Sequence, residues 1–118
     1  FYDWNILLNK EGGPNHVGNY CDAPFLFDEE RKELLQRMSA DYYWHFAHFI
    51  QPGAVRLGFS RYTDEIDVTA WENPDGRIVL ILLNRGEEAV PVHIRISGKE
   101  TEIVLSAHSI VSGVISRE

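Results

Sequence analysis

The stretch "IDVTAWENPDGRIVLILLN", residues 66–84, predicts the fold class of the C-terminal half of this chain. Its Asp75-Gly76 pair lies between two apolar runs, which is a strong local signal for a β-hairpin. The second run contains the longest unbroken apolar segment, Ile78 to Leu83, and its six residues are far fewer than the roughly 20 that cross a bilayer. We therefore predict two antiparallel strands here and no transmembrane segment.

Strand-like segments continue on both sides of this hairpin. The segment "VPVHIRI", residues 90–96, alternates apolar and polar side chains, so one of its faces is expected to be buried. The other segments of this kind are "VRLGF" at 55–59, "ETEIVLS" at 100–106 and "SIVSGVIS" at 109–116. Six strands separated by turns with glycine predict an antiparallel sheet or sandwich, so we assign residues 54–118 to an all-β domain.

One segment before the β-rich part predicts a helix. This segment is "SADYYWHFAHFI", residues 39–50, which Ser39 can cap and Pro52-Gly53 can end. Apolar side chains recur at helical spacing, at Tyr42, Phe46, Phe49 and Ile50. Tyr43 and Trp44 widen this stripe almost around the cylinder, so we expect the helix to need neighbours on more than one side.

The opening "FYDWNILLN", residues 1–9, predicts a short strand or the end of one. Its compact Ile6-Leu7-Leu8 run suits a strand that is covered on both faces. One strand and one helix cannot enclose the many aromatic side chains of this region. We therefore assign residues 1–53 to a piece of a larger α/β structure.

The segment "PFLFDEERKELLQR", residues 24–37, has two interpretations. The acidic residues from Asp28 onward suit a helix N-terminus, where they complement the helix dipole. Two short strands, 25–27 and 34–36, joined by a charged turn are the alternative. Periodicity alone leaves both interpretations open.

The loop "EGGPNHVGNYCDAP", residues 11–24, is unusually long and rich in residues that specify backbone conformation. Such loops more often frame a binding site than simply join two elements. Polar and aromatic side chains gather in and near it, at Trp4, Asn5, Asn15, His16, Asn19 and Tyr20. A flat ring and several amides are the parts of a carbohydrate site. The structural alternative is that the asparagines serve turns and Trp4 belongs to the core.

Other candidate chemistry is weak. His45 and His48 are three residues apart, but "HFAH" supplies no third ligand, so we expect no metal. Cys21 is the only cysteine, which excludes an intramolecular disulfide, and the negative Asp22 beside it disfavours a reactive thiolate. No spacing singles out a pair of catalytic carboxylates. The residues themselves therefore indicate no catalytic group and no cofactor.

The charge balance argues against one class of partner. The chain has 18 acidic and 11 basic residues, a formal net charge of -7, and its arginines are scattered along the sequence. Such a surface repels phosphate backbones, so we expect no nucleic-acid partner.

Residues 3–24, "DWNILLNKEGGPNHVGNYCDAP", resemble glycoside hydrolase family 30, and specifically its glucosylceramidase-like members. The likeness continues through "YYWHFAHFIQPGAVRLG", "DVTAWENPDGRIVLILLNR" and "LSAHSIVSGVI". It implies an α+β fragment: the end of a (β/α)8 barrel, with its last strand, loop and helix, followed by an antiparallel β-sandwich that strands from near the protein's N-terminus complete. It also favours the hairpin for residues 25–36, and it places the loop 11–24 over the active site.

The resemblance further implies an activity. By this resemblance the mechanism is retaining hydrolysis by two glutamates, one the nucleophile and one the general acid/base. Carboxyl groups about 5–5.5 Å apart permit the covalent intermediate of such a reaction. The two glutamates of the family lie on barrel strands four and seven, and neither is in this sequence. We therefore expect the C-terminal part of a retaining β-glycosidase that hydrolyses O-glycosidic bonds of a carbohydrate or glycolipid, inactive alone and partnered by the missing N-terminal barrel portion.

Four residues match positions that bind substrate in the family. By this resemblance Trp4 lines the sugar pocket, Asn19 hydrogen-bonds a sugar hydroxyl, and Tyr20 lies at the cleft rim. His16 departs from the lysosomal glucosylceramidase pattern, which has tryptophan there. This departure leaves room for oligosaccharides such as β-1,6-glucans, or for xylosides.

An alternative is a freestanding carbohydrate-binding or structural β-sandwich module. Its aromatic residues would be Phe59, Tyr62 and Trp71. This alternative predicts that the isolated chain binds oligosaccharides, whereas a fragment of a hydrolase should bind them negligibly.

Overall fold

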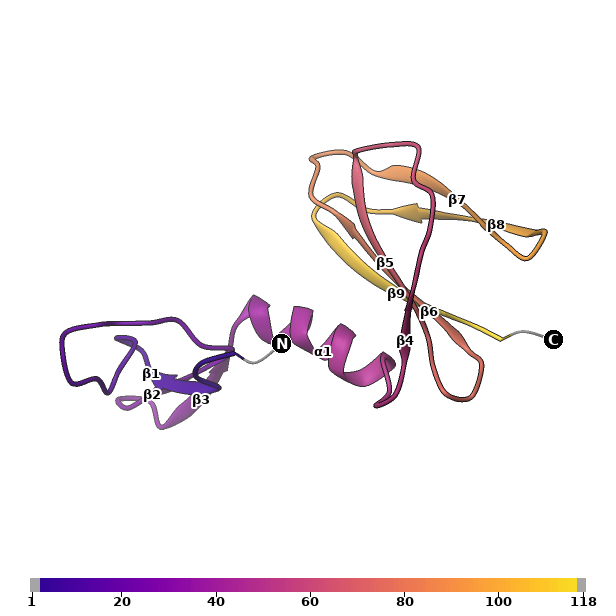
Figure 1. Cartoon of the computed structure of the whole chain (residues 1–118). Coiled ribbons are helices and arrows are strands. Elements are labelled where there is room, and N and C mark those ends of the chain that lie inside the picture. The colour runs from indigo at the N-terminus through magenta and orange to yellow at the C-terminus, as the bar shows by residue number, and fades with distance from the viewer. Residues whose placement is uncertain (1–2, 117–118) are drawn as a thin grey trace. The chain divides into compact units, whose positions relative to one another are not determined.

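The computed structural model describes residues 3–116, which divide into two compact units with the boundary between Trp44 and His45. Most regular elements are strands, and α1 is the only helix among the described residues, in agreement with the predicted α+β composition (Figure 1). In chain order the elements are β1 (Leu7–Asn9), β2 (Phe25–Asp28), β3 (Glu33–Gln36), α1 (Met38–Phe49), β4 (Val55–Leu57), β5 (Ile66–Glu72), β6 (Ile78–Asn84), β7 (Val90–Ile96), β8 (Lys99–Leu105) and β9 (Ser109–Ile115).

A three-stranded sheet organises the first unit, with β2 in the middle. Strand β1 runs parallel to β2, with Leu7 opposite Phe25, and β3 runs antiparallel to it. The hairpin interpretation of residues 25–36 is therefore confirmed, and the helix interpretation is wrong. Buried Asp28 explains the outcome, because its Oδ1 accepts the backbone N–H groups of Glu30 and Arg31 and so holds the turn.

The opening strand is shorter and less covered than predicted. Strand β1 begins only at Leu7, and residues 1–2 of the predicted strand lie outside the described residues. Leu8 is buried against Ala23 and Leu26, whereas the side chain of Leu7 is half exposed. Coverage on both faces is therefore wrong for this chain, because alternate strand residues point to opposite faces and only one face has a core to contact.

Helix α1 confirms the predicted helix with a shift of one residue. Its N-terminus does not use Ser39 as a cap: Ser39 lies inside the first turn, and its buried Oγ has no hydrogen-bond partner within the described chain. A cap residue must have non-helical backbone, and that position falls before Met38. The C-terminus is as predicted, since the helix ends just before Pro52 and Gly53 has a left-handed φ of 88°.

The second unit contains the six predicted strands in two antiparallel layers (Figure 1). One layer is a four-stranded sheet in the order β4-β5-β6-β9, and the other is the hairpin β7–β8. The β5–β6 hairpin has Glu72 opposite Ile78, and its turn at residues 73–77 is closed by hydrogen bonds between Asn73 and Arg77 and between Gly76 and Asn73. The alternation predicted for residues 90–96 is confirmed, with Val92 buried and His93 exposed.

The two layers share a core. Ile66 and Leu82 of the sheet pack with Val92 and Leu105 of the hairpin, and Leu105 is fully buried. Buried Asn84 closes one end of this core: its Nδ2 donates to the backbone carbonyls of Glu88, Leu105 and Ser106. These bonds matter because a backbone carbonyl removed from water costs free energy unless it accepts a hydrogen bond.

Candidate functional site

Hydrogen bonds among Asn9, Gly12, Gly13 and Cys21 close the base of the loop 11–24, and we call these four residues the neck. Asn9 accepts the backbone N–H of Gly13 through Oδ1 at 2.7 Å, and Cys21 donates its backbone N–H to the carbonyl of Gly12 at 3.0 Å. Gly12 has a φ of 86°, and a Cβ built there would lie 2.3 Å from the carbonyl oxygen of Cys21. Only glycine fits this close approach of two backbones. The neck therefore fixes where residues 14–20 leave the sheet.

The predicted site residues are all exposed. Trp4 precedes β1 and is 86% exposed, and Tyr20 in the loop is 63% exposed. His16 and Asn19 are also on the surface of the loop. In the part of the chain that the structure describes, no hydrogen bond, ion pair or ring contact joins Trp4 to these three loop residues. The alternative in which Trp4 belongs to the core is therefore wrong for this chain, and the binding role of the four residues stays a prediction.

A cleft of about 350 Å³ is lined in part by the residues that flank Trp4 in the chain. Its lining comes from the segment before β1, the start of β2 and the helix α1, and consists of Asp3, Asn5, Ile6, Pro24, Phe25, Ala40 and Tyr43. The cleft thus includes both chain neighbours of Trp4 and none of the four predicted residues. Its apolar wall and few polar groups are typical of a small-molecule subsite.

Asp3 and Tyr43, which both line this cleft, are joined by a hydrogen bond. The phenolic O–H of Tyr43 donates to Oδ2 of Asp3, and the backbone N–H of Trp4 donates to Oδ1 of Asp3 at 2.8 Å. The bond from Tyr43, and secondly the bond from Trp4, hold the pKa of Asp3 below its usual value, while the same bond from Asp3 raises the pKa of Tyr43. At neutral pH the pair is a carboxylate and a neutral phenol.

Histidines take structural positions in the second unit. His45 shares a hydrogen bond of 2.7 Å between its Nδ1 and the Oγ of Ser112, and His48 packs edge-on against Phe49. His93 and His108 lie close to Glu102 and Glu87. Over residues 3–116, no group of three or more His, Cys, Asp or Glu side chains could hold a metal ion.

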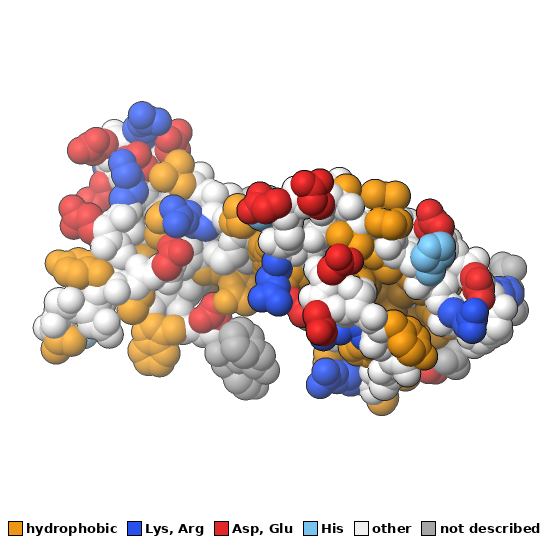
Figure 2. Space-filling view, turned by 90° about the horizontal axis from the view of Figure 1, so that it is seen from above, with side chains coloured by type: hydrophobic (Ala, Val, Ile, Leu, Met, Phe, Trp, Pro, Cys, Tyr) orange, Lys and Arg blue, Asp and Glu red, His pale blue; other side chains and the backbone are white. Residues whose placement is uncertain are grey.

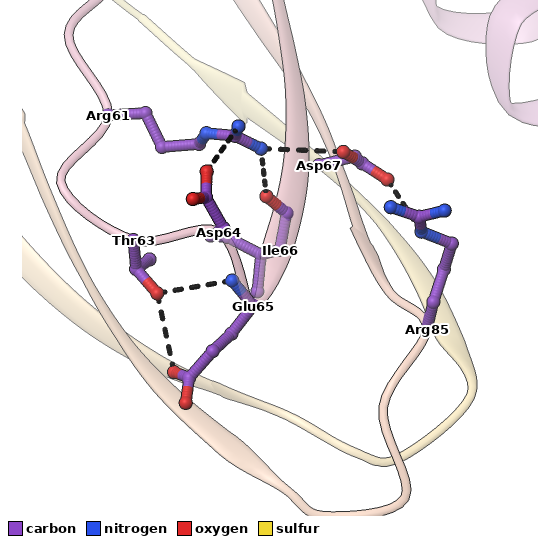
Figure 3. A network of polar contacts seen from close by, with 7 residues as sticks. All are labelled: Arg61, Thr63, Asp64, Glu65, Ile66, Asp67 and Arg85. Atoms are coloured by element: carbon purple, nitrogen blue, oxygen red, sulfur yellow. Dashed lines mark hydrogen bonds and ion pairs between the residues drawn. The ribbon is translucent and has the colours of Figure 1, made fainter.

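A larger cavity of about 1170 Å³ lies within the second unit, between its two layers. Leu57 at the end of β4 and the segment 58–63 that follows it form one wall, and Arg61 anchors this segment through hydrogen bonds and ion pairs (Figure 3). Its guanidinium donates to the carbonyl of Ile66 at 2.6 Å and contacts Asp64 and Asp67, and Asp67 also pairs with Arg85 at 2.8 Å. This network joins the β4–β5 segment to the turn after β6.

The surface charge is mixed. On the face shown in Figure 2, Lys and Arg side chains lie among Asp and Glu side chains and form no single basic field. No helix in the described part of the chain has the length and apolar character needed to cross a membrane.

Comparison with known proteins identifies the family. Residues 53–113 match the family model described as the glycosyl hydrolase family 30 beta sandwich domain, and residues 1–51 match that of its TIM-barrel domain. The chain belongs to glycosyl hydrolase family 30. The predicted fold class, the end of a (β/α)8 barrel followed by a β-sandwich, is confirmed, whereas the boundary after residue 53 stays a prediction.

Individual relatives agree with this assignment. The chain is 38% identical over 94 residues to the lysosomal acid glucosylceramidase of Mus musculus, an alignment that covers 78% of this chain and 18% of the relative. It resembles the crystal structure of SrfJ from Salmonella typhimurium with a TM-score of 0.94 and 34% identity, covering 98% of this chain and 26% of that one. The endo-beta1,6-glucanase BT3312 shares the fold, with a TM-score of 0.85, 24% identity, and the same two coverages. The chain therefore spans about a fifth to a quarter of the length of these proteins.

Sequence reasoning missed the pair Asp3 and Tyr43. The spacing of the acidic residues singles out no partner for Asp3, and the helical pattern places Tyr43 in an apolar stripe. The two residues are 40 positions apart, so no local spacing links them. The one available signal was that an Asp directly before Trp4 can accept the next backbone N–H.

Proposed function

We propose that the whole protein is a retaining β-glycosidase that hydrolyses a β-glucoside of the glucosylceramidase type, and that this chain supplies part of its sugar subsite. The observation that carries the proposal is the 38% identity to a lysosomal acid glucosylceramidase across most of the chain. The exposed indole of Trp4, beside an apolar cleft, is consistent with a ring that stacks on a sugar.

The catalytic glutamates belong, in this proposal, to the rest of the barrel. Retention requires two carboxyl groups about 5–5.5 Å apart, one as nucleophile and one as acid and base. Asp3 does not suit the acid role, because its lowered pKa keeps it ionised and both of its oxygens already accept hydrogen bonds. This chain alone is expected to be inactive.

In this proposal the binding partner of this chain is the rest of the same protein, and the exposed apolar surface of the chain supports this. Helix α1 leaves large apolar side chains exposed, among them Trp44 at 51% and Phe46 at 42%. Among the residues of the second unit that the structure describes, one layer has four strands and the other has two, with the large cavity between them. We infer that the missing barrel portion covers the helix and that further strands complete the small layer.

The test uses the full-length protein. We expect it to hydrolyse a nitrophenyl β-glucoside and glucosylceramide, and proton NMR should show the β-anomer of glucose as the first product. Release of the α-anomer first would contradict the retaining mechanism. Activity on a β-1,6-glucan or a β-xyloside and none on either glucoside would contradict the substrate class.

The role of Trp4 is tested by Trp4→Ala in the same protein. Loss of the stacking ring is expected to lower kcat/KM at least tenfold, which corresponds to about 1.4 kcal/mol. Tyr62→Ala is the matched control, because Tyr62 is 97% exposed but lies in the β-rich unit. Equal kcat/KM values for Trp4→Ala and the unmodified protein would refute the role of Trp4.

A further inference from the structure

Within residues 3–116, the segment that carries Trp4 makes few backbone hydrogen bonds. Strand pairing begins only at Leu7, and the last backbone bond before it joins the N–H of Phe25 to the carbonyl of Ile6. Ile6 and Trp4 are both largely exposed. An indole on such a segment can adopt several positions unless another contact fixes the backbone, and each position would cost binding energy.

Asp3 supplies this contact. One carboxylate oxygen accepts the backbone N–H of Trp4, and the other accepts the hydroxyl of Tyr43 on α1. The carboxylate thus connects the segment before β1 to the helix α1. Both oxygens are engaged, so the group is suited to hold geometry rather than to react with substrate.

We propose that Asp3, anchored by Tyr43, is a positioning residue that holds the backbone of Trp4 so that its indole lies at the sugar subsite. This inference rests on the proposed function, because it acts through the sugar contact of Trp4. Asp3 itself is not a catalytic residue in this scheme. Tyr43 is a positioning residue as well, because its hydroxyl orients the carboxylate of Asp3.

The protonation states agree with this role. Asp3 has a pKa below its usual value of 3.8, and Tyr43 has a pKa above its usual value of 10.0, each chiefly because of their mutual hydrogen bond. Between these limits the carboxylate accepts and the phenol donates. The contact is therefore intact across the pH range in which a glycosidase works.

The experiment is a double-mutant cycle in the full-length enzyme, with kcat and KM measured separately. We expect Asp3→Ala to lower kcat/KM by about tenfold and by no more than Trp4→Ala does, because misplacing the indole cannot cost more than removing it. Asp3→Ala combined with Trp4→Ala should be no worse than Trp4→Ala alone, because both changes remove one interaction. If the fold-loss of kcat/KM in the double variant equals the product of the losses in the two single variants, the proposal is overturned.

Conservative variants separate positioning from loss of folding. Asp3→Asn can still accept the N–H of Trp4 and can donate its amide to the Tyr43 hydroxyl, so it should recover most of the activity that Asp3→Ala loses. Tyr43→Phe removes the anchor without changing Asp3 and should give a partial loss. Asp41→Ala, an exposed acid on the same helix bonded to Gln36, is the control and should stay within twofold of the unmodified enzyme.

The outcomes distinguish this proposal from the function on which it rests. If Trp4→Ala lowers kcat/KM but Asp3→Ala and Tyr43→Phe do not, the positioning role is wrong and the sugar contact stands. If Asp3→Asn is as impaired as Asp3→Ala, the positioning role is also wrong. If Trp4→Ala has no effect, the sugar contact fails and the positioning role fails with it.

Discussion

At the scale of single residues, Gly12 shows how one position can specify a loop. Its backbone is left-handed, and its α-carbon faces the backbone of Cys21 so closely that a methyl group would overlap the carbonyl oxygen. Gly18 in the same loop is also left-handed, with a φ of 70°, but a Cβ there would contact nothing within 4 Å. The two glycines share the conformational requirement and differ in the steric one.

This difference predicts unequal effects of the same substitution. Gly18→Ala is expected to lower the free energy of unfolding by about 1 kcal/mol, the cost of a left-handed alanine. Gly12→Ala should cost about 3 kcal/mol or more, because the clash adds to the strained backbone. Urea unfolding of the full-length variants measures both values, and equal costs would show that the neck is not close-packed.

Asp28 is a second residue with a defined role. It is 2% exposed, holds the β2–β3 turn, and pairs with Lys10 at 3.0 Å. Its pKa lies below the usual value, chiefly because the backbone N–H of Arg31 and the ammonium of Lys10 donate to it. A lowered pKa means that the ionised form stabilises the fold above pH 3.8 and that this stability is lost as the pH falls through the folded-state pKa.

The corresponding prediction concerns Asp28→Asn. The amide can keep the turn but cannot pair with Lys10 as a charge, so Tm should be lower than that of the unmodified protein near pH 6. The gap should begin to narrow below about pH 3.8, where Asp28 of the unfolded chain takes up a proton, and should close only below the lowered folded-state pKa of Asp28. Scanning calorimetry from pH 6 to pH 3 measures the gap, and a gap that does not depend on pH would contradict this assignment.

At the scale of elements, the C-terminal end of α1 is joined to the β5–β6 hairpin. Buried Asn73 in the hairpin turn donates its Nδ2 to the carbonyl of Phe49 at 2.9 Å and accepts the N–H of Gln51 at 3.0 Å. It therefore satisfies one of the carbonyls that every helix leaves open at its end. The turn that forms a local hairpin also caps a helix that lies more than 20 residues earlier in the chain.

We expect Asn73→Ala to lower the free energy of unfolding by about 1–3 kcal/mol, because two backbone groups lose their partner away from water. Asp75→Ala in the same turn removes an exposed pair with Arg77 and the exposed hydrogen bond from the Arg77 backbone N–H to Asp75 Oδ1, and should lower it by less than about 1 kcal/mol. Chemical denaturation of both variants provides the comparison. A cost for Asn73→Ala no larger than that for Asp75→Ala would show that the cap contributes little.

At the scale of the whole molecule, the β-rich unit depends on contacts between its two layers. Leu105 on β8 is fully buried among Ile66, Leu82 and Val92, while Val104 beside it is 64% exposed. Leu105→Ala should cost about 2–5 kcal/mol, the usual range for a leucine removed from a packed core. Val104→Ala should cost less than about 0.5 kcal/mol. Thermal unfolding of the two variants measures the difference, and similar Tm values would mean that the layers are not held by this core.

The family and the outline of the fold were predictable from sequence, because their signals are local. The Asp75-Gly76 turn, the alternation of residues 90–96 and the Pro52-Gly53 helix exit each depend on neighbours in the chain, and each was confirmed. The helix start at Ser39 and the coverage of β1 were wrong, since both depend on which surrounding groups are present. Residues 25–36 needed the resemblance to favour the hairpin.

The sequence by itself determined which strands and turns form, because backbone propensity and apolar spacing act over a few residues. Only the tertiary structure decided that Tyr43 contacts Asp3, that Asn73 caps α1, and that Gly12 meets Cys21. The physical reason is that each of these contacts joins residues 9 to 40 positions apart. Such residues come together only when the chain folds, so no periodic pattern in the sequence predicts their contact.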